Sequence, residues 1–221
     1  MAFWIANVAG LVAAYLCGSI PTAYLMGKLF FGLDIREHGS KSIGATNALR
    51  VLGKWPALVV LLVDVFKGLA AVVLVRWLCS WLFAHPFAAP PPTLDQQTWT
   101  PWAVSLAGLA ALLGHSRSIW LRFSGGKSVA TGLGVVLALS WPVALGALAA
   151  FAVVTAIYRI VSLGSILAAL TAIVLMICLG QPLPYQLLIS AGGAYVVARH
   201  RANITRLLAG TEPRIGQSLG R

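Results

Sequence analysis

Long apolar runs alternate with short polar segments along the chain. Predominantly apolar stretches cover residues 3–26, 55–83 and 99–113, and the loop at residues 88–97 contains three consecutive prolines. A helix needs about 20 apolar residues to cross the hydrocarbon core of a bilayer. The pattern therefore predicts three membrane-spanning helices in the first half of the chain.

The second half of the chain carries charge only at widely spaced positions. Lys127 and Arg159 are separated by 31 residues without a charged side chain, and Arg159 and Arg199 by 39. If basic residues stay on one side of the membrane, each interval must hold an even number of crossings. We therefore expect a hairpin of two spans in each interval, with turns at Trp141-Pro142 and at residues 180–184.

The distribution of Lys and Arg supports this arrangement. Fifteen of the 16 basic residues fall on, or run inward from, one predicted side, and Arg76 is the exception. Because basic residues accumulate on cytoplasmic loops, we expect seven helices with the N-terminus outside and the C-terminus in the cytoplasm.

The composition agrees with a membrane protein. Hydrophobic residues make up 59% of the 221 residues and charged residues 10%, against about 25% charged residues in a soluble domain. The net charge of +11 would favour nucleic acid in a soluble protein, but no groove-reading motif is present. We therefore predict an all-α polytopic membrane protein, a single domain over residues 1–221, that does not bind nucleic acid.

Neither the cysteines nor the histidines indicate a metal site. The three cysteines lie inside apolar runs without a Cys-x-x-Cys pair, and the four histidines lie far apart in sequence. We expect no metal ion.

A first polar segment, residues 34–50, combines glycines, hydroxyls, Asn47 and two arginines, Arg36 and Arg50. Glycine lets the backbone approach a ligand closely, and hydroxyls can hydrogen-bond to it. The composition alone leaves a ligand-binding loop and an ordinary solvated loop equally open.

A second polar segment leads into an apolar helix through Gly125-Gly126-Lys127-Ser128. Free N–H groups at a helix N-terminus, beside a lysine, favour an anion. The glycine spacing is not that of a Walker A motif, which disfavours an ATPase. The alternative is a glycine-rich turn at the membrane boundary.

A third polar segment covers residues 199–213. At helical spacing His200 and Asn203 share a face flanked by arginines. The alternative is a basic tail that binds lipid headgroups.

Two further pairs are candidate supports. Asp64 and Lys67 lie three residues apart in an apolar run, where they can neutralise each other on one helix face. Ser162 and Ser165 follow Arg159 and can add hydroxyl donors.

Together these segments closely resemble the PlsY family, the bacterial acyl-phosphate:glycerol-3-phosphate acyltransferases. The resemblance covers nearly the whole chain and rests on motifs in the expected order. They are Gly18-Ser19-Ile20-Pro21-Thr22-Ala23-Tyr24, Asp34-Ile35-Arg36 with Gly39-Ser40, Gly44-Ala45-Thr46-Asn47 with Leu49-Arg50, Gly125-Gly126-Lys127 with Val129-Ala130-Thr131-Gly132, Ser162-Leu163, and His200-Arg201 with Asn203-Ile204.

The resemblance implies acyl transfer from acyl phosphate to the 1-hydroxyl of sn-glycerol 3-phosphate, giving lysophosphatidic acid and phosphate. It also implies no cofactor, a monomer, contact with membrane lipids, and an active site on the cytoplasmic face of the bacterial inner membrane. The site residues it implies fall into three groups. They are catalytic Ser40, Arg50, His200 and Asn203; phosphate-binding Gly125, Gly126, Lys127 and Ser165; and supporting Asn47, Asp64, Lys67 and Ser162.

The chain departs from the family pattern in three places. Lys41-Ser42 stand where Gly-Asn is expected, Arg117-Ser118 where Phe-Pro is expected, and Ser124 and Ser128 replace Lys and Gly around the glycine pair. These changes put the fine geometry of substrate binding in question.

The main alternative is a membrane transporter of a phosphorylated solute. A transporter should place its polar site at the bilayer midplane and often contains internal repeats. Here the polar segments cluster at one predicted face, which favours the enzyme.

Overall fold

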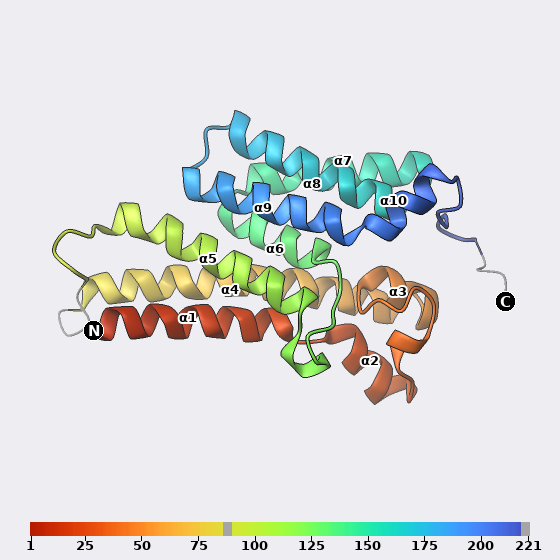
Figure 1. The fold of residues 1–221 in the computed structure, drawn as a ribbon, viewed down its shortest axis with the longest axis horizontal. Coiled ribbons are helices and arrows are strands. Elements are labelled where there is room, and N and C mark those ends of the chain that lie inside the picture. The colour runs from red at the N-terminus through yellow and green to blue at the C-terminus, as the bar shows by residue number, and fades with distance from the viewer. Residues whose placement is uncertain (86–89, 218–221) are drawn as a thin grey trace.

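The computed structural model describes residues 1–85 and 90–217, and the described part is helical (Figure 1). Its longer helices are α1 (Ala2–Ser19), α4 (Lys54–Ala84), α5 (Gln96–Ser116), α6 (Val129–Leu139), α7 (Trp141–Tyr158), α8 (Val161–Cys178) and α9 (Leu183–Arg199). Its shorter helices are α2 (Thr22–Phe31), η1 (Ile35–Glu37), α3 (Ala45–Val51), η3 (Ile119–Leu121) and α10 (Arg201–Leu208). Residues 88 and 89 of the predicted proline-rich loop lie outside the described residues.

Four of these helices, α1, α4, α7 and α8, are long and apolar enough to cross a membrane. Helices α5, α6 and α9 correspond to the other three predicted spans. However, α6 has 11 residues, so its length of roughly 16 Å falls short of the hydrocarbon core. It ends at Leu139, Ser140 caps it, and Trp141-Pro142 begins α7, as the sequence predicted.

The first apolar run does not form one helix, contrary to the prediction. Helix α1 ends at Ser19, and after Ile20 and Pro21 the chain starts a separate helix, α2. Proline favours an extended preceding residue, and Ile20 has φ −54° and ψ 115°. The Ile20 carbonyl that this break frees accepts a hydrogen bond from Lys67 Nζ at 2.8 Å.

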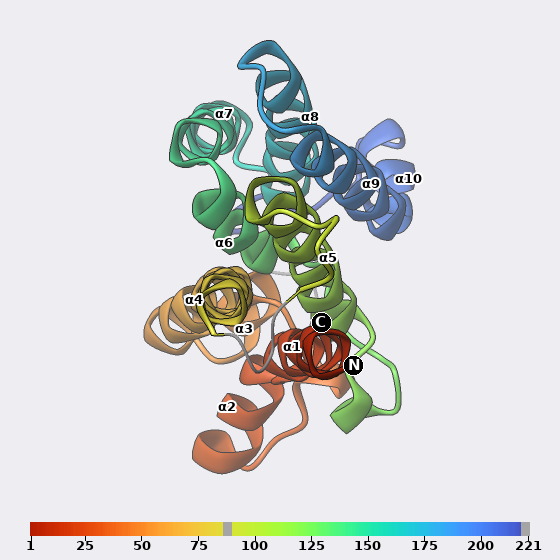
Figure 2. The same cartoon turned by 90° about the vertical axis from the view of Figure 1, so that its left-hand side faces the viewer.

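The long helices form two groups joined by α5 and α6. Figure 2 shows α1 and α4 on one side, α7, α8 and α9 on the other, and α5 and α6 between them. Helices α4 and α6 approach closely because glycine removes side chains at the crossing. A Cβ on Gly134 would lie 1.9 Å from the Val65 carbonyl oxygen, and one on Gly68 2.1 Å from that of Thr131.

The short helices gather at one end of the molecule. In Figure 1, α2, α3 and α10 lie at the end opposite the N-terminus. The first polar segment, which contains α3, and the third, which contains α10, therefore lie at the same end, although they are far apart along the chain.

Candidate functional site

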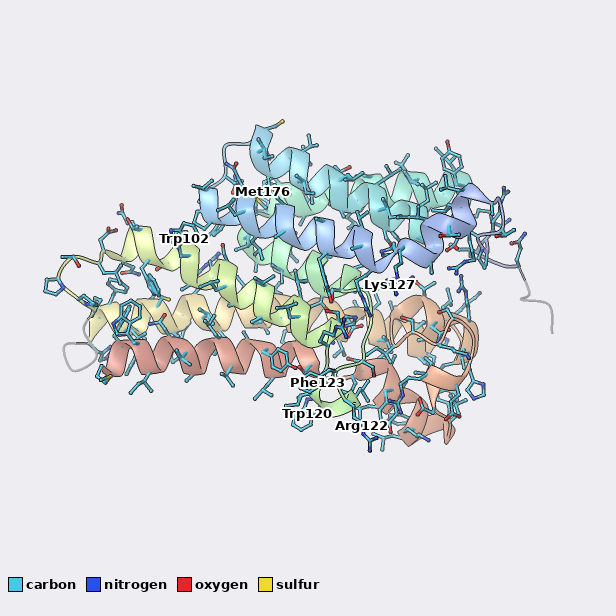
Figure 3. All side chains as sticks on the ribbon, in the orientation of Figure 1. Trp102, Trp120, Arg122, Phe123, Lys127 and Met176 are labelled. Atoms are coloured by element: carbon cyan, nitrogen blue, oxygen red, sulfur yellow. The ribbon has the colours of Figure 1, made fainter. Side chains whose placement is uncertain are left out.

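A cavity of about 480 Å³ opens between the helices, with polar side chains at one end and apolar side chains along the rest. Its apolar walls come from α4, α6, α7, α8 and α9. Figure 3 shows Lys127, at the polar end, in the half of the molecule that holds α3 and α10. This distribution of polar and apolar side chains suits a ligand with a polar head and an apolar tail, and the volume lies in the usual range of ligand pockets.

The cavity brings together most of the residues that the sequence singled out. Those that line it are Ser40, Asn47, Arg50, Asp64, Lys127, Ser162, Ser165, His200 and Asn203. The other three, Gly125, Gly126 and Lys67, are not among its lining residues.

Asn47 organises the first polar segment. Its buried Nδ2 donates to the carbonyls of Ile35, His38 and Ser42, and its Oδ1 accepts the Ser40 N–H at 2.8 Å. One side chain therefore fixes the loop that presents Ser40 to the cavity.

The two arginines of this segment have different surroundings. Arg36 pairs with Asp34, whose carboxylate it holds at 2.7 Å, and this bond lowers the pKa of Asp34 to about 2. Arg50, in the last turn of α3, is exposed and lines the cavity. Arg50 is therefore the arginine of the segment that can meet an anion.

Lys127 connects the second polar segment to the third. Its Nζ donates to Asn203 Oδ1, and Asn203 Nδ2 in turn donates to Glu212 Oε1. Because its hydrogen-bond partner is a neutral amide, Lys127 keeps its charge available for an anion in the cavity. Burial lowers the pKa of Lys127 to about 8, although the nearby Glu212 carboxylate acts in the opposite direction.

Glu212 is a site residue that the sequence reasoning did not select. It is buried, lines the cavity, and accepts from Ser162 Oγ at 2.7 Å and from Arg206 Nε at 2.7 Å. Burial alone would raise its pKa, but the hydrogen bonds from Ser162, Asn203 and Arg206 outweigh burial and lower it. The signal in the sequence was a lone acid just after the basic helix α10.

His200 lies at the junction of α9 and α10, where it is 3% exposed and lines the cavity. Its Nδ1 lies 2.8 Å from the Val196 carbonyl oxygen. A carbonyl can only accept, so the neutral ring carries its proton on Nδ1 and keeps Nε2 as an acceptor. Burial lowers the pKa of His200, which favours this neutral form.

The glycine pair packs more tightly than the sequence led us to expect. The Gly126 N–H is not free, because it donates to the His115 carbonyl at 3.1 Å. Arg199 donates to the carbonyls of both Gly125 and Gly126 at 3.1 Å. The amides that remain for an anion are those of the first turn of α6, where Val129 and Ala130 line the cavity.

Asp64 and Lys67 form the predicted ion pair, with Nζ 2.8 Å from Oδ1 and both side chains almost fully buried. His115 lies beside them, with Nδ1 3.8 Å from Asp64 Oδ1. Sequence reasoning missed this third member because it comes from α5, 51 positions after Asp64.

The two serines of α8 make different bonds. Ser162 donates to Glu212, whereas Ser165 donates to the Val161 carbonyl of its own helix at 2.8 Å. Both line the cavity. The Ser165 oxygen keeps its acceptor lone pairs and can redirect its hydrogen toward a ligand.

Two of the unusual residues occupy backbone positions that favour glycine. Lys41 has φ 57° and Ser128 has φ 61°, both in the left-handed region. Ser128 Oγ donates to the Leu112 carbonyl at 2.8 Å, a bond that glycine could not make. Both substituted residues therefore adopt a backbone conformation that glycine adopts more readily.

The arrangement can bind phosphate groups. Lys127, Arg50 and the helix amides supply positive potential at one end of a cavity whose remainder accepts an alkyl chain. Among the described residues, no group of three or more His, Cys, Asp or Glu side chains is placed to hold a metal ion.

Known proteins resemble this chain along its length. The sequence profile of the glycerol-3-phosphate acyltransferase family matches residues 8–210. Glycerol-3-phosphate acyltransferase 2 of Rhizobium johnstonii is 67% identical over 98% of this chain and 99% of its own length. The glycerol-3-phosphate acyltransferase of Trichodesmium erythraeum is 54% identical over 96% of this chain and 93% of its own length.

Solved structures of a glycerol 3-phosphate acyltransferase also resemble this chain. The crystal structure of PlsY, an integral membrane glycerol 3-phosphate acyltransferase, in its glycerol 3-phosphate form superposes with a TM-score of 0.81 at 35% identity. The match covers 95% of this chain and 96% of that one. Its lysophosphatidic acid form superposes with a TM-score of 0.78 at 33% identity, covering 95% of each chain. The chain therefore belongs to the PlsY family of integral membrane glycerol-3-phosphate acyltransferases.

Proposed function

We propose that this enzyme transfers a fatty acyl group from acyl phosphate to the 1-hydroxyl of sn-glycerol 3-phosphate, giving lysophosphatidic acid and phosphate. The observation that carries the proposal is the cavity, which joins a phosphate-binding end around Lys127 to apolar walls. Family membership favours this reaction over the transport of a phosphorylated solute.

The reaction needs no base from the protein. The glycerol oxygen forms a bond to the acyl carbon, the bond from that carbon to the phosphate oxygen breaks, and the hydroxyl proton passes to the leaving phosphate. The histidines support a reaction without a protein base, because in the part of the chain that the structure describes neither His200 nor His115 has a hydrogen-bonded carboxylate to orient it. His200 Nδ1 bonds to a backbone carbonyl, and His115 Nδ1 lies 3.8 Å from the Asp64 carboxylate, beyond hydrogen-bond distance.

The residues then divide the work by their position. Lys127, Arg50 and the first amides of α6 hold phosphate groups, with Ser165 as a further donor. Ser40, His200 and Asn203 orient the substrates and stabilise the oxyanion that forms at the acyl carbon. Asn47, Asp64, Lys67 and Ser162 support them through the bonds described above.

The glycine pair acts through the backbone. Gly125 and Gly126 let the loop pass directly over the end of α5, where a Cβ on Gly125 would lie 2.3 Å from the His115 carbonyl oxygen. Their contribution to phosphate binding is to place Lys127 and the start of α6. Because one chain supplies the whole cavity lining, we infer that a monomer suffices.

A product assay tests the function. Purified enzyme in lipid receives acyl phosphate and glycerol 3-phosphate, and the product is identified by mass. Lysophosphatidic acid should form only when both substrates are present. A correctly folded protein that forms no lysophosphatidic acid from these substrates would contradict the proposed reaction.

We also propose seven spans in the bacterial inner membrane, with the N-terminus outside and the active site facing the cytoplasm. The seven longer helices and the one-sided Lys and Arg distribution support this topology. A reporter active only outside the cytoplasm should work when fused near Pro91 and fail when fused after Gly210. The reverse pattern would contradict the orientation.

A further inference from the structure

A buried polar cluster lies at the wall of the cavity, where α1, α2, α4 and α5 meet, and two of its members, Asp64 and His115, line the cavity. Asp64, Lys67 and His115 have exposures of 1%, 2% and 4%. Asp64 Oδ1 accepts from Lys67 Nζ and from Thr22 Oγ1 at 3.1 Å, and Lys67 also donates to the Ile20 carbonyl. The ion pair is thus fixed by the break between α1 and α2.

His115 is held against this pair but is not fully bonded. Among the described residues, neither its Nδ1 nor Asp64 Oδ2 has a hydrogen-bond partner, although both atoms are buried. An unpartnered buried polar atom is costly, so its retention beside a carboxylate calls for a function. His115 Nδ1 faces the Asp64 carboxylate at 3.8 Å, a distance at which charge can orient the ring without a hydrogen bond.

The other side of the ring supports the glycine loop. A Cβ on Gly126 would lie 2.2 Å from His115 Nε2, and the Gly126 N–H donates to the His115 carbonyl. Both the ring and the backbone of residue 115 therefore contact Gly126. From the opposite direction, Arg199 holds the two glycine carbonyls, so the loop is clamped between α5 and α9.

We propose that His115 is a positioning residue, which sets the height of the glycine loop and thereby places Lys127 and the first amides of α6, and that the Asp64–Lys67 pair orients its ring. The inference rests on the proposed phosphate-binding role of this loop. Because Nδ1 faces Asp64 and Nε2 faces Gly126, the ring acts through the loop. It does not act as a base on the glycerol hydroxyl.

Steady-state kinetics of His115→Ala and His115→Gln test the proposal. Loss of the ring should raise KM for glycerol 3-phosphate by roughly tenfold or more, since small displacements of binding groups have large effects, while kcat stays within about threefold. His115→Gln should recover much of the loss, because its amide reaches the position of Nε2. Ser105→Ala, a buried serine of the same helix, is the matched control and should leave KM unchanged.

Any of three results would overturn the proposal. The first is an unchanged KM in His115→Ala, and the second is a Gln variant no better than Ala. The third is a loss confined to kcat, which would indicate a base. Kinetics of Lys127→Ala, measured in parallel, separate the phosphate-binding role of the loop from the positioning role of His115. If Lys127→Ala keeps a normal KM, the phosphate-binding role of the loop is wrong, whereas a large effect of Lys127→Ala with none of His115→Ala removes only the role of His115.

The ion pair is tested by replacing both charges together, as Asp64→Asn with Lys67→Met, so that no buried charge is left alone. Residues that act as one unit show non-additive effects. Adding His115→Ala to this pair should therefore raise KM no further than His115→Ala alone, and effects that multiply would contradict the coupling. Should the paired variant fail to accumulate, the His115 series alone decides.

Discussion

The two ends of the cavity are built by different means. At the polar end, side chains from distant segments meet through hydrogen bonds: Lys127 donates to Asn203, and Ser162 donates to Glu212. At the apolar end, helices α6, α8 and α9 contribute small or branched side chains such as Val135, Ala172 and Ile189, all almost fully buried. Ligand binding at the polar end depends on the angle and charge of single groups, and ligand binding at the apolar end depends on the volume that the walls leave.

This difference has a consequence for substitution. Removing one group from the polar end leaves an anion without its partner, whereas the apolar walls tolerate exchanges that preserve volume. Substitutions at the polar end should therefore change rates by orders of magnitude. Substitutions in the walls should change which acyl chain is preferred.

The largest expected effect follows from Lys127→Ala. The substitution removes the cation beside the first turn of α6, where a phosphate is favoured both by charge and by free amides. The rate of acyl transfer should fall on the order of a hundredfold or more. Near-normal turnover of a folded variant would show that the glycine loop is a turn without a role in phosphate binding. Comparing its expression with that of the unmodified enzyme checks the fold.

A second effect concerns pH. Lysine is charged below its pKa, and burial holds the pKa of Lys127 at about 8. The value of kcat/KM for glycerol 3-phosphate, which reports the free enzyme, should thus fall by about tenfold per unit as pH rises beyond this value. Lys127→Arg should move this alkaline limb out of the accessible range, because arginine stays charged. An unmoved limb would assign it to another group.

The smallest effect is expected in the apolar wall. Ala172 on α8 is 5% exposed and lines the cavity, so Ala172→Phe should shorten the space for the acyl chain. The ratio of kcat/KM for long over short acyl donors should fall severalfold, as a hydrophobic pocket discriminates by about 1–3 kcal/mol per methylene. Val174→Phe on the exposed face of the same helix is the matched control. An equal loss for all donors would argue against a wall that measures chain length.

The sequence predicted the polar end in part. Segment composition and the position of glycines pointed to Lys127, and the helical spacing of His200 and Asn203 placed them on one face. The bond between Lys127 and Asn203 joins positions 76 apart, so no local pattern could reveal it. His115 was missed for the same reason, since its ring lies beside Asp64 of α4, which is distant in sequence. Glu212 differs, because it bonds to Asn203 and Arg206 of the adjacent α10, and its local signal was overlooked.

The fold shows a similar division. Long apolar runs and charge spacing located the longer helices and the break at Trp141-Pro142. They did not reveal the separate helix α2 after Pro21, because the apolar run continues through the break. Nor did they reveal that the Gly126 N–H donates a hydrogen bond to the His115 carbonyl, because this bond depends on how the loop packs against α5.

The central claim is that the substrate's own phosphate, not a protein base, accepts the hydroxyl proton. The most direct test compares acyl phosphate with acyl-CoA as donor, under the same conditions in lipid. An acyl-CoA thioester leaves no phosphate oxygen beside the attacking hydroxyl, and His200 has a backbone carbonyl as its partner in place of an orienting carboxylate. The account predicts lysophosphatidic acid with acyl phosphate and essentially none with acyl-CoA. Comparable rates with both donors would contradict it and direct attention to His200 and His38 as bases.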